Sequence, residues 1–537
     1  MPYRLLIGFL CTALTGLTWA ATPITPCKES LNAPLTVHAS GWSRDLAQTR
    51  DTTAEQAGLS AADVSQLELQ WAFAFDDTNQ PRSLPAITEH AIFIGSQEGT
   101  LFALDRRSGC AYWQFKAGDT PIRTAVSVVE LDDQPLVFFG NDDAVAFALN
   151  AITGELVWQL EVDPHEDAVI TGSPVYHDGF LYVPASSFEV GSALKPWYHC
   201  CQFRGSISKL NAVTGERIWQ SFSIPEQPAP SVRNILGVQQ YGPSGAPIWS
   251  SPTIDVARNR LYFGTGQNYS SPADHNSDAI HAIDLATGER IWRTQFLAED
   301  SWNPACNFKW LSFNCPDEDG PDYDFGAPPI LATLEDGRQL LLAGQKSGMV
   351  FAINPDTGDT VWMQSVGRGG TLGGVHWGMA ADHQHLYVPI SDLNIWGINT
   401  PGEQRPSLNR IDLASGETVW RVPAIFNCND ADGDLIDGCR NGLSAALTLI
   451  PGAVFAPGLD GVLRAHRRDS GAVIWQYDTK QTVMGVNGLE GEGGTLDAGG
   501  AVVADGQVFI NSGYGGIISA GSKGGNVFLV FGKKAAE

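Results

Sequence analysis

Short runs of alternating apolar and polar residues recur along this chain, and seven of them share one signature. In each run, an apolar stretch leads into a polar turn that contains Gly, and a Trp stands four residues after that Gly. The copies are LFALDRRSGCAYW, AFALNAITGELVW, ISKLNAVTGERIW, IHAIDLATGERIW, VFAINPDTGDTVW, LNRIDLASGETVW and LRAHRRDSGAVIW, which end at Trp113, Trp158, Trp219, Trp292, Trp362, Trp420 and Trp475. Each copy predicts a hairpin of two strands, with its Trp packed against the neighbouring sheet.

An eighth copy is split between the two ends of the chain. LELQWAFAF supplies a strand with Trp71, and GNVFLVFG supplies a strand without a following turn and Trp. Pairing these strands in one sheet closes a ring and removes exposed edges. The sequence therefore predicts an all-β, eight-bladed β-propeller in a single domain, residues 22–537. Two separate β-sandwiches, the alternative, do not repeat one strand-turn-strand signature.

Residues 1–21 have the pattern of a cleavable secretory signal. Arg4 precedes an apolar run from Leu5 to Leu17, and small residues follow at Ala20 and Ala21. The run is short for a membrane span, and no later stretch is long and apolar enough for one. The sequence therefore predicts export to the periplasm without a membrane span.

Cysteine usage agrees with export. Without Cys11 of the signal, eight cysteines remain, and an even number in an exported chain predicts disulfides. The close pairs are Cys306 with Cys315 and Cys428 with Cys439, and elimination leaves Cys27 with Cys110; Cys200 and Cys201 are adjacent. No CxxCH motif for covalent haem occurs.

Charge excludes one class of partner. The chain has 33 Lys and Arg against 59 Asp and Glu, a net charge of −26. Because phosphate binding depends on clustered positive charge, a nucleic-acid partner is not expected.

Three segments between the repeats give the chain a family resemblance. The runs SSFEVGSALKPWYHCCQFRGSISKLNAVTG, WSSPTIDVARNRLYFGTGQNYSSP and NCPDEDGPDYDFGAPPIL resemble quinoprotein alcohol dehydrogenases that bind pyrroloquinoline quinone (PQQ), and most of all the polyvinyl-alcohol dehydrogenase branch. The likeness extends from Trp42 to the C-terminus. It implies PQQ, one Ca²⁺ or lanthanide ion, and an alcohol, secondary or polymeric, that gives hydride to PQQ while an Asp removes its proton. It also implies a separate c-type cytochrome as electron acceptor.

The resemblance implies oxygen ligands for the ion, as a hard cation requires. Glu189 matches the carboxylate ligand. The amide ligand is Asn268, with Gln267 as the alternative one position earlier. The alternative for each residue is a loop or turn side chain that binds no ion.

The segment GPDYDFGAPPIL matches the catalytic region of the family. A register without gaps makes Asp322 the catalytic base and a metal ligand, and Asp324 a further ligand of the kind that lanthanide-using members carry. In an extended segment both side chains face the same way. A register shifted by two makes Asp324 the base and puts Gly326 at the discriminating position, which favours calcium. Two solvated loop acids are the alternative without function.

The cofactor contacts are also implied by the resemblance. Arg123 pairs with a PQQ carboxylate, Thr171 and Ser186 donate to another, and Lys346 contacts the quinone oxygens. Trp249 stacks against one face of PQQ, and a Cys200–Cys201 disulfide covers the other. Trp377 and His376 stand either near the substrate entrance or in the core.

A propeller without cofactor that serves as a scaffold in outer-membrane protein assembly is the competing hypothesis. Such scaffolds share the Gly and Trp repeats, so the repeats do not separate the two. A scaffold has no need for the inserted Glu189, Asn268, Asp322, Lys346 and Cys200/Cys201.

Overall fold

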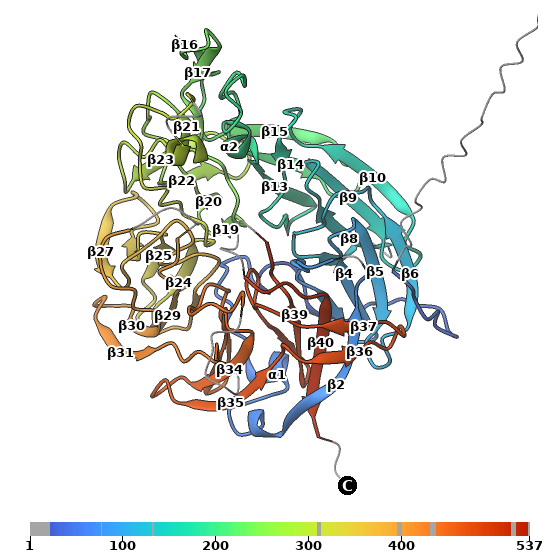
Figure 1. Ribbon diagram of the computed structural model, residues 1–537. Coiled ribbons are helices and arrows are strands. Elements are labelled where there is room, and N and C mark those ends of the chain that lie inside the picture. The colour runs from blue at the N-terminus through green and yellow to red at the C-terminus, as the bar shows by residue number, and fades with distance from the viewer. Residues whose placement is uncertain are drawn as a thin grey trace, which may run out of the picture.

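Eight sheets of four or five strands are arranged in a ring (Figure 1). The structure is a computed structural model and describes residues 22–76, 78–131, 134–308, 313–394, 400–429, 437–516 and 522–534. The prediction of an eight-bladed propeller is confirmed. The predicted signal, residues 1–21, lies outside the described residues.

The first four sheets follow one another along the chain. They consist of β1 (Val37–Ala39), β3 (Ala86–Thr88), β4 (Ala91–Gly95), β5 (Thr100–Asp105) and β6 (Ala111–Lys116); β7 (Ser127–Leu131), β8 (Gln134–Gly140), β9 (Val145–Asn150) and β10 (Leu156–Glu161); β11 (Ala168–Val169), β12 (Val175–His177), β13 (Phe180–Ser187), β14 (Ser206–Asn211) and β15 (Arg217–Phe222); and β19 (Thr253–Asp255), β20 (Arg260–Gly264), β22 (Ala279–Asp284) and β23 (Arg290–Gln295).

The remaining four sheets complete the ring. They consist of β24 (Ile330–Thr333), β25 (Gln339–Gly344), β26 (Met349–Ile353) and β27 (Thr360–Ser365); β28 (Ala380–Ala381), β29 (His385–Ile390), β30 (Ser407–Asp412) and β31 (Thr418–Pro423); β32 (Thr448–Ile450), β33 (Ala453–Pro457), β34 (Val462–Arg467) and β35 (Val473–Asp478); and β38 (Val502–Ala504), β39 (Gln507–Ser512), β40 (Val527–Lys533) and β2 (Leu67–Ala74).

Short elements lie in the connections between blades. They are the helices α1 (Ala54–Ala57) and α2 (Glu189–Ser192), the 3-10 turns Val64–Gln66 and Pro304–Phe308, and the paired strands β16 (Ala229–Arg233) with β17 (Gln239–Gly242), β18 (Ser244–Gly245) with β21 (Asn268–Ser270), and β36 (Thr482–Met484) with β37 (Glu490–Glu492). None of the helices in the described part of the chain is long and apolar enough to cross a membrane.

The two ends of the chain meet in one sheet, as the split repeat predicts. β2 pairs antiparallel with β40, and Leu67 lies opposite Lys533 while Ala74 lies opposite Val527. This pairing closes the ring, so neither terminal strand presents an open edge on that side.

The recurrent Trp residues tie each blade to the next through a hydrogen bond. In all eight cases, from Trp71 to Trp475, the indole N–H donates to a backbone carbonyl in the following blade, at 2.9 to 3.3 Å. The last of them, from Trp475 to Leu67 O, joins the seventh blade to the split eighth one. The repeat signature therefore specifies the contact between blades.

The turn between β26 and β27 shows why the repeat needs its Gly. Asn354 Oδ1 accepts a bond from Asp356 N at 2.8 Å, and Gly358 N donates to Asn354 O at 2.9 Å. Gly358 has φ of +80°, and a Cβ there would lie 2.7 Å from the ring of Trp292 in the preceding blade. Only Gly combines this left-handed backbone with so close a contact.

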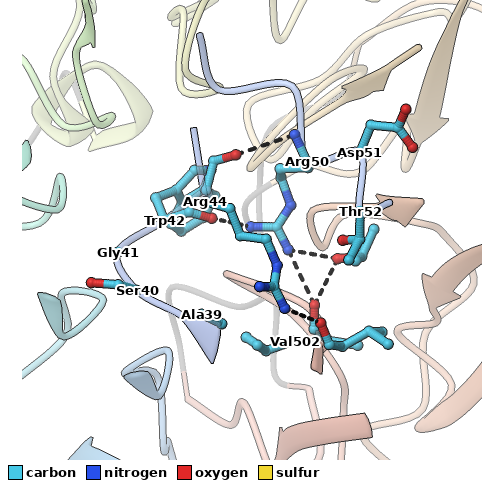
Figure 2. Close-up of a pocket in the computed structure, with 13 residues that line it drawn as sticks. Ala39, Ser40, Gly41, Trp42, Arg44, Arg50, Asp51, Thr52 and Val502 are labelled. Atoms are coloured by element: carbon cyan, nitrogen blue, oxygen red, sulfur yellow. Dashed lines mark hydrogen bonds between the residues drawn. The ribbon is translucent and has the colours of Figure 1, made fainter. Parts of the chain in front are cut away.

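The segment of residues 41–50 lies across the first strands of several blades. Backbone hydrogen bonds join it to six sheets through Gly41–Val126, Leu46–Ile254, Ala47–Leu331, Thr49–Ala381, Arg50–Leu449 and Arg44–Val503 (the last from the Arg44 side chain). Arg50 anchors it beside a pocket (Figure 2), where its buried guanidinium donates to Trp42 O and Leu447 O at 2.6 Å and to Gly499 O at 2.8 Å. With these bonds to backbone carbonyls, Arg50 serves as a structural anchor.

Four disulfides join the eight cysteines of the described residues. The predicted pairs Cys27–Cys110, Cys306–Cys315 and Cys428–Cys439 are confirmed, and Cys200 is bonded to Cys201.

Candidate active site

Two acidic side chains and one Lys meet in a buried cluster between the fourth and fifth blades. Asp322 and Asp324 lie in the loop before β24, and Lys346 lies in the turn between β25 and β26. The Lys346 ammonium is 3.1 Å from Asp322 Oδ1 and 2.7 Å from Asp324 Oδ2. All three side chains are buried, so the structure brings together the predicted base, the predicted extra ligand and the predicted quinone contact.

Trp249, in the loop before β19, borders this cluster. Its indole N–H donates to Asp324 Oδ2 at 3.1 Å, and Lys346 Nζ lies 5.3 Å from its ring centroid. Thr171 Oγ1 donates to Trp249 O at 3.3 Å. On the other side, the ring of Trp377 lies 5.4 Å from that of Trp249 at an angle of 85°.

Burial and like charge govern the titration of the cluster. Burial raises the pKa of Asp322 well above its usual value, and Asp324 and Asp300 add to this although Lys346 opposes it. Burial disfavours the ammonium of Lys346, but Asp322 and Asp324 outweigh it and raise the Lys346 pKa. The nearby His376 is kept neutral, because burial and then Lys346 lower its pKa well below the usual value.

Asp300 holds the backbone that carries Asp322. Its two carboxylate oxygens accept bonds from Asp322 N at 3.1 Å and Tyr323 N at 2.8 Å. It is buried, which raises its pKa to about 6 although these two N–H donors oppose the shift. Asp300 therefore fixes the backbone at Asp322, and with it the direction in which the Asp322 side chain points.

The two candidate amide ligands point to different partners. Asn268 in β21 accepts a bond from Asp274 N at 2.8 Å and donates to Ser244 O at 3.0 Å, so its side chain fastens the β18–β21 connection. Gln267, one residue earlier, donates its backbone N–H to Asp324 Oδ1 at 2.9 Å. The buried Gln267 side chain makes no hydrogen bond to the described residues.

Glu189, at the start of α2, is a fully buried carboxylate. It accepts bonds from Gln202 N at 2.7 Å, Phe203 N at 2.9 Å and Tyr198 Oη at 3.0 Å. His165 Nε2 lies 3.3 Å from Glu189 Oε1, and although burial opposes its charged form, Glu189 raises the His165 pKa. Glu189 therefore accepts hydrogen bonds from two backbone N–H groups and one phenol, with His165 within ion-pair distance.

The Cys200–Cys201 disulfide directly precedes the two backbone N–H groups that bind Glu189. Tyr241 N in β17 donates to Cys200 O at 2.8 Å, which fixes this segment against the β16–β17 hairpin. Buried Tyr269 relates the two halves of the site: burial raises its pKa, and Asp324, Glu189 and Asp322 add to the rise. Glu189 and the Asp322–Asp324 cluster thus act electrostatically on the same phenol, whose hydroxyl donates to Ser187 O at 3.3 Å.

Arg123 lies at the edge of this region. Its guanidinium is 3.9 Å from Asp142 Oδ2 and lies 5.8 Å from the ring centroid of Phe188, the residue before Glu189. Ser186, also buried, lies in β13 opposite Val169. The predicted contacts therefore come from the second to fifth blades and the segments that connect them, with Ser186 in β13 and Asn268 in β21.

Comparison with known proteins identifies the family. The profile described as "Glucose/ethanol/alcohol dehydrogenase, beta-propeller domain" matches residues 40–369, and that of "Outer membrane protein assembly factor BamB" matches residues 276–530. "Polyvinylalcohol dehydrogenase" from Pseudomonas sp. is 36% identical over 91% of this chain and 76% of its own length, and that from Sphingopyxis sp. (strain 113P3) is 35% identical over 89% and 72%. The crystal structure of the quinohemoprotein alcohol dehydrogenase from Comamonas testosteroni superposes with a TM-score of 0.66 at 20% identity, covering 93% of this chain and 81% of that one.

The chain belongs to the PQQ-dependent quinoprotein alcohol dehydrogenase family. It is an enzyme of that class. The second profile covers the later repeats, which is the part of the sequence that the scaffold hypothesis shares.

The sequence analysis did not assign three charged residues of this quinoprotein to the site: Asp300, Arg82 and Asp142. Asp300 stands in an ordinary loop sequence, and nothing beyond its place before Trp302 marks it. Arg82 lies 4.7 Å from the Tyr514 ring centroid, and burial lowers its pKa. Asp142, whose pKa burial raises, faces Arg123 and Arg82. A local motif does not reveal them, because their partners are distant in the sequence, about 20 residues away for Asp300 and more than 400 for Arg82 and Tyr514.

Proposed function

We propose that this quinoprotein oxidises a secondary or polymeric alcohol, such as polyvinyl alcohol, with PQQ and one bound Ca²⁺ or lanthanide ion. The observation that carries the proposal is the buried cluster of Asp322, Asp324 and Lys346 against Trp249. The substrate class follows the two relatives named polyvinylalcohol dehydrogenase.

The surroundings of the cluster fit a flat, polyanionic cofactor. Among the described residues, the buried Nε of Arg82 and the buried indole N–H of Trp377 have no hydrogen-bond partner. Such unpaired donors are rare in native proteins and are suited to carboxylates of a ligand. Arg123, Thr171 and Ser186 are the further donors, and the Trp249 ring offers an aromatic face for stacking.

Oxygen ligands for the cation come from both halves of the site. Glu189, Asp322 and Asp324 supply carboxylates, and we favour the Gln267 amide over that of Asn268, because the buried Gln267 side chain makes no hydrogen bond to the described residues, whereas the Asn268 amide oxygen accepts from Asp274 N. Carboxylate and amide oxygens are what a Ca²⁺-like ion prefers. When bound, PQQ supplies the acceptor for the hydride, and the ion supplies electrostatic activation of that acceptor.

The chain itself supplies the base and its orientation. Asp322 takes the hydroxyl proton of the alcohol, and Asp300 positions it through the N–H groups of Asp322 and Tyr323. Lys346, which keeps its proton, balances the negative charge of the Asp322 and Asp324 carboxylates. The register with Asp324 as the base remains the alternative, since Lys346 bonds to both carboxylates.

Export by residues 1–21 and electron transfer to a separate c-type cytochrome complete the proposal. Both follow from the sequence pattern and the family resemblance. The four disulfides agree with an oxidising compartment.

Reconstitution of the purified chain tests the proposal. The protein is incubated with PQQ and either Ca²⁺ or La³⁺, and alcohol oxidation is followed with an artificial dye as acceptor. We expect activity on a secondary alcohol and on polyvinyl alcohol, at least about 10³-fold lower in Asp322→Ala, with the melting temperature of the fold retained. Asp336→Ala, at an exposed turn far from the cluster, is the control. Absence of PQQ binding and of activity with either ion would refute the enzyme and favour the scaffold.

Loss of activity in Asp324→Ala with La³⁺ but not with Ca²⁺ would identify Asp322 as the base. Full activity of the wild type with Ca²⁺, together with an Asp324→Ala variant that is inactive with both ions, would instead support the shifted register.

A further inference from the structure

One buried carboxylate has no role in the site described so far. Asp278 directly precedes β22 and is fully buried, and neither of its carboxylate oxygens has a hydrogen-bond partner among the described residues. The hydroxyl of its neighbour Ser277 donates to Asp274 O at 3.4 Å, and its lowering effect on the Asp278 pKa is the smallest of the neighbouring effects. Because an unpaired buried carboxylate is costly, the chain keeps Asp278 at the expense of its folding stability.

Backbone contacts place Asp278 next to the cluster. Its N–H donates to Gly266 O at 3.2 Å. A Cβ on Gly266 would lie only 2.6 Å from Asp324 Oδ1, so the Asp324 carboxylate packs directly on the same Gly. Burial raises the pKa of Asp278 well above its usual value, and Asp300, Asp324 and Asp322 raise it further.

The charges in this region do not balance. Asp278 interacts electrostatically with Asp300, Asp322 and Asp324, and the ammonium of Lys346 bonds to two of these four carboxylates, those of Asp322 and Asp324. If all five groups are ionised, their net charge is −3. Lys346 bonds to Asp322 and Asp324, and two backbone N–H groups bond to Asp300, so Asp278 is the member of the set whose carboxylate oxygens accept no hydrogen bond from the described residues.

We infer that Asp278 is an electrostatic positioning residue for the bound cation: its unpaired carboxylate strengthens cation binding and favours a trivalent ion over a divalent one. The inference rests on the proposed function, because it requires an ion at the Asp322–Asp324 cluster. Coulomb attraction is proportional to the charge of the ion, so a fixed carboxylate stabilises a trivalent ion by 3/2 of the free energy that it gives a divalent one.

The test measures ion binding directly in the full-length, chelator-treated protein. Tb³⁺ binding is followed by luminescence that Trp249 sensitises, and Ca²⁺ affinity is obtained by competition. We expect Asp278→Asn to weaken Ca²⁺ binding about tenfold and Tb³⁺ binding about thirtyfold, in keeping with the 3:2 ratio of free energies. Because the substitution removes an unpaired buried charge, it raises the melting temperature of the ion-free protein by about 2–4 °C.

Asp255→Asn is the matched control. Asp255 is equally buried, but Arg258 and Tyr262 donate to its carboxylate, and it lies in β19 away from the cluster. We expect this variant to have a lower melting temperature and an unchanged Tb³⁺ affinity.

Several outcomes would overturn the inference. Asp278→Asn with both ion affinities within twofold of the wild type, or with a lowered melting temperature or a failure to fold, would show that Asp278 is structural. In either case the proposed function stands if the wild type binds Tb³⁺ and oxidises alcohol. A wild type that binds neither ion would instead refute the ion site and the proposed function together.

Discussion

Replacing Lys346 with Met tests whether the cluster is a charged site held together by one ammonium. At an effective dielectric constant of about 20, an ammonium 3.1 Å from Asp322 and 2.7 Å from Asp324 attracts them by about 5 and about 6 kcal/mol. Much of this attraction offsets the cost of burying Lys346. Removing one partner of a buried ion pair usually destabilises a protein by about 3–5 kcal/mol, and we expect a loss in this range.

The loss of unfolding free energy in Lys346→Met should depend on pH, in a direction that the pKa of Asp322 determines. Without Lys346, the pKa of Asp322, which burial already raises, rises further, so the folded state favours its neutral form. Such groups contribute stability at low pH, and this contribution is lost as the pH rises through the raised pKa. The free energy of unfolding of the Lys346→Met variant should therefore fall further below that of the wild type at pH 8 than at pH 5.

Urea-induced unfolding of the ion-free protein at the two pH values measures both effects, and dye-linked alcohol oxidation after reconstitution measures the loss of turnover. Lys209→Met is the control, because Lys209 is also buried but bonds to no carboxylate in the described part of the chain: it donates to Leu285 O at 3.1 Å and lies over the rings of Phe180 and Tyr182. We expect it to lose about 1–2 kcal/mol at both pH values and no activity. Equal losses for Lys346→Met at pH 5 and pH 8, with activity retained, would refute the reasoning.

Three further predictions concern the blades, the cofactor and the acidic loop. Gly358→Ala should lower the free energy of unfolding by about 2–4 kcal/mol, against about 1 kcal/mol for Gly337→Ala, because both have positive φ but only the first meets a Trp ring; equal urea midpoints would contradict the docking role. Arg82→Gln should weaken PQQ binding about 10- to 100-fold by fluorescence titration, and the exposed Arg405→Gln should leave it unchanged. The raised pKa of Asp300, about 6, implies that ion-free stability is lost by up to about 3 kcal/mol as the pH rises from 4 to 6, and Asp300→Asn should flatten that dependence in a series of unfolding experiments.

The fold could be predicted because one local signature contains both halves of the contact between blades. The Gly of a turn and the Trp of the preceding blade pack together, as Gly358 and Trp292 do, and each is visible in its own repeat. The split copy with Trp71 was recognisable for the same reason. Strand order and closure then follow from counting the copies.

The site could be predicted only in part. The segments that carry Asp322, Asp324, Lys346 and Trp249 differ from the repeats, so they stood out in the sequence, and the structure places them together. The choice between Gln267 and Asn268 depends on the pairing of β18 with β21, for which the sequence has no signal. Adjacent residues of an extended strand face opposite sides, so an error of one position reverses the side chain.

The repeats stabilise the fold and the loops carry the charged groups of the site, which explains why the fold tolerates several buried carboxylates close together. The Trp–Gly contacts and the closure of β2 on β40 stabilise the ring through groups remote from Asp278, Asp300 and Asp322. Those acids therefore do not have to contribute to folding. A cation that binds among them relieves their mutual repulsion, and this relief favours binding. A site whose charges were already neutralised within the protein would gain less from an ion, since the ion would first have to displace the internal partners.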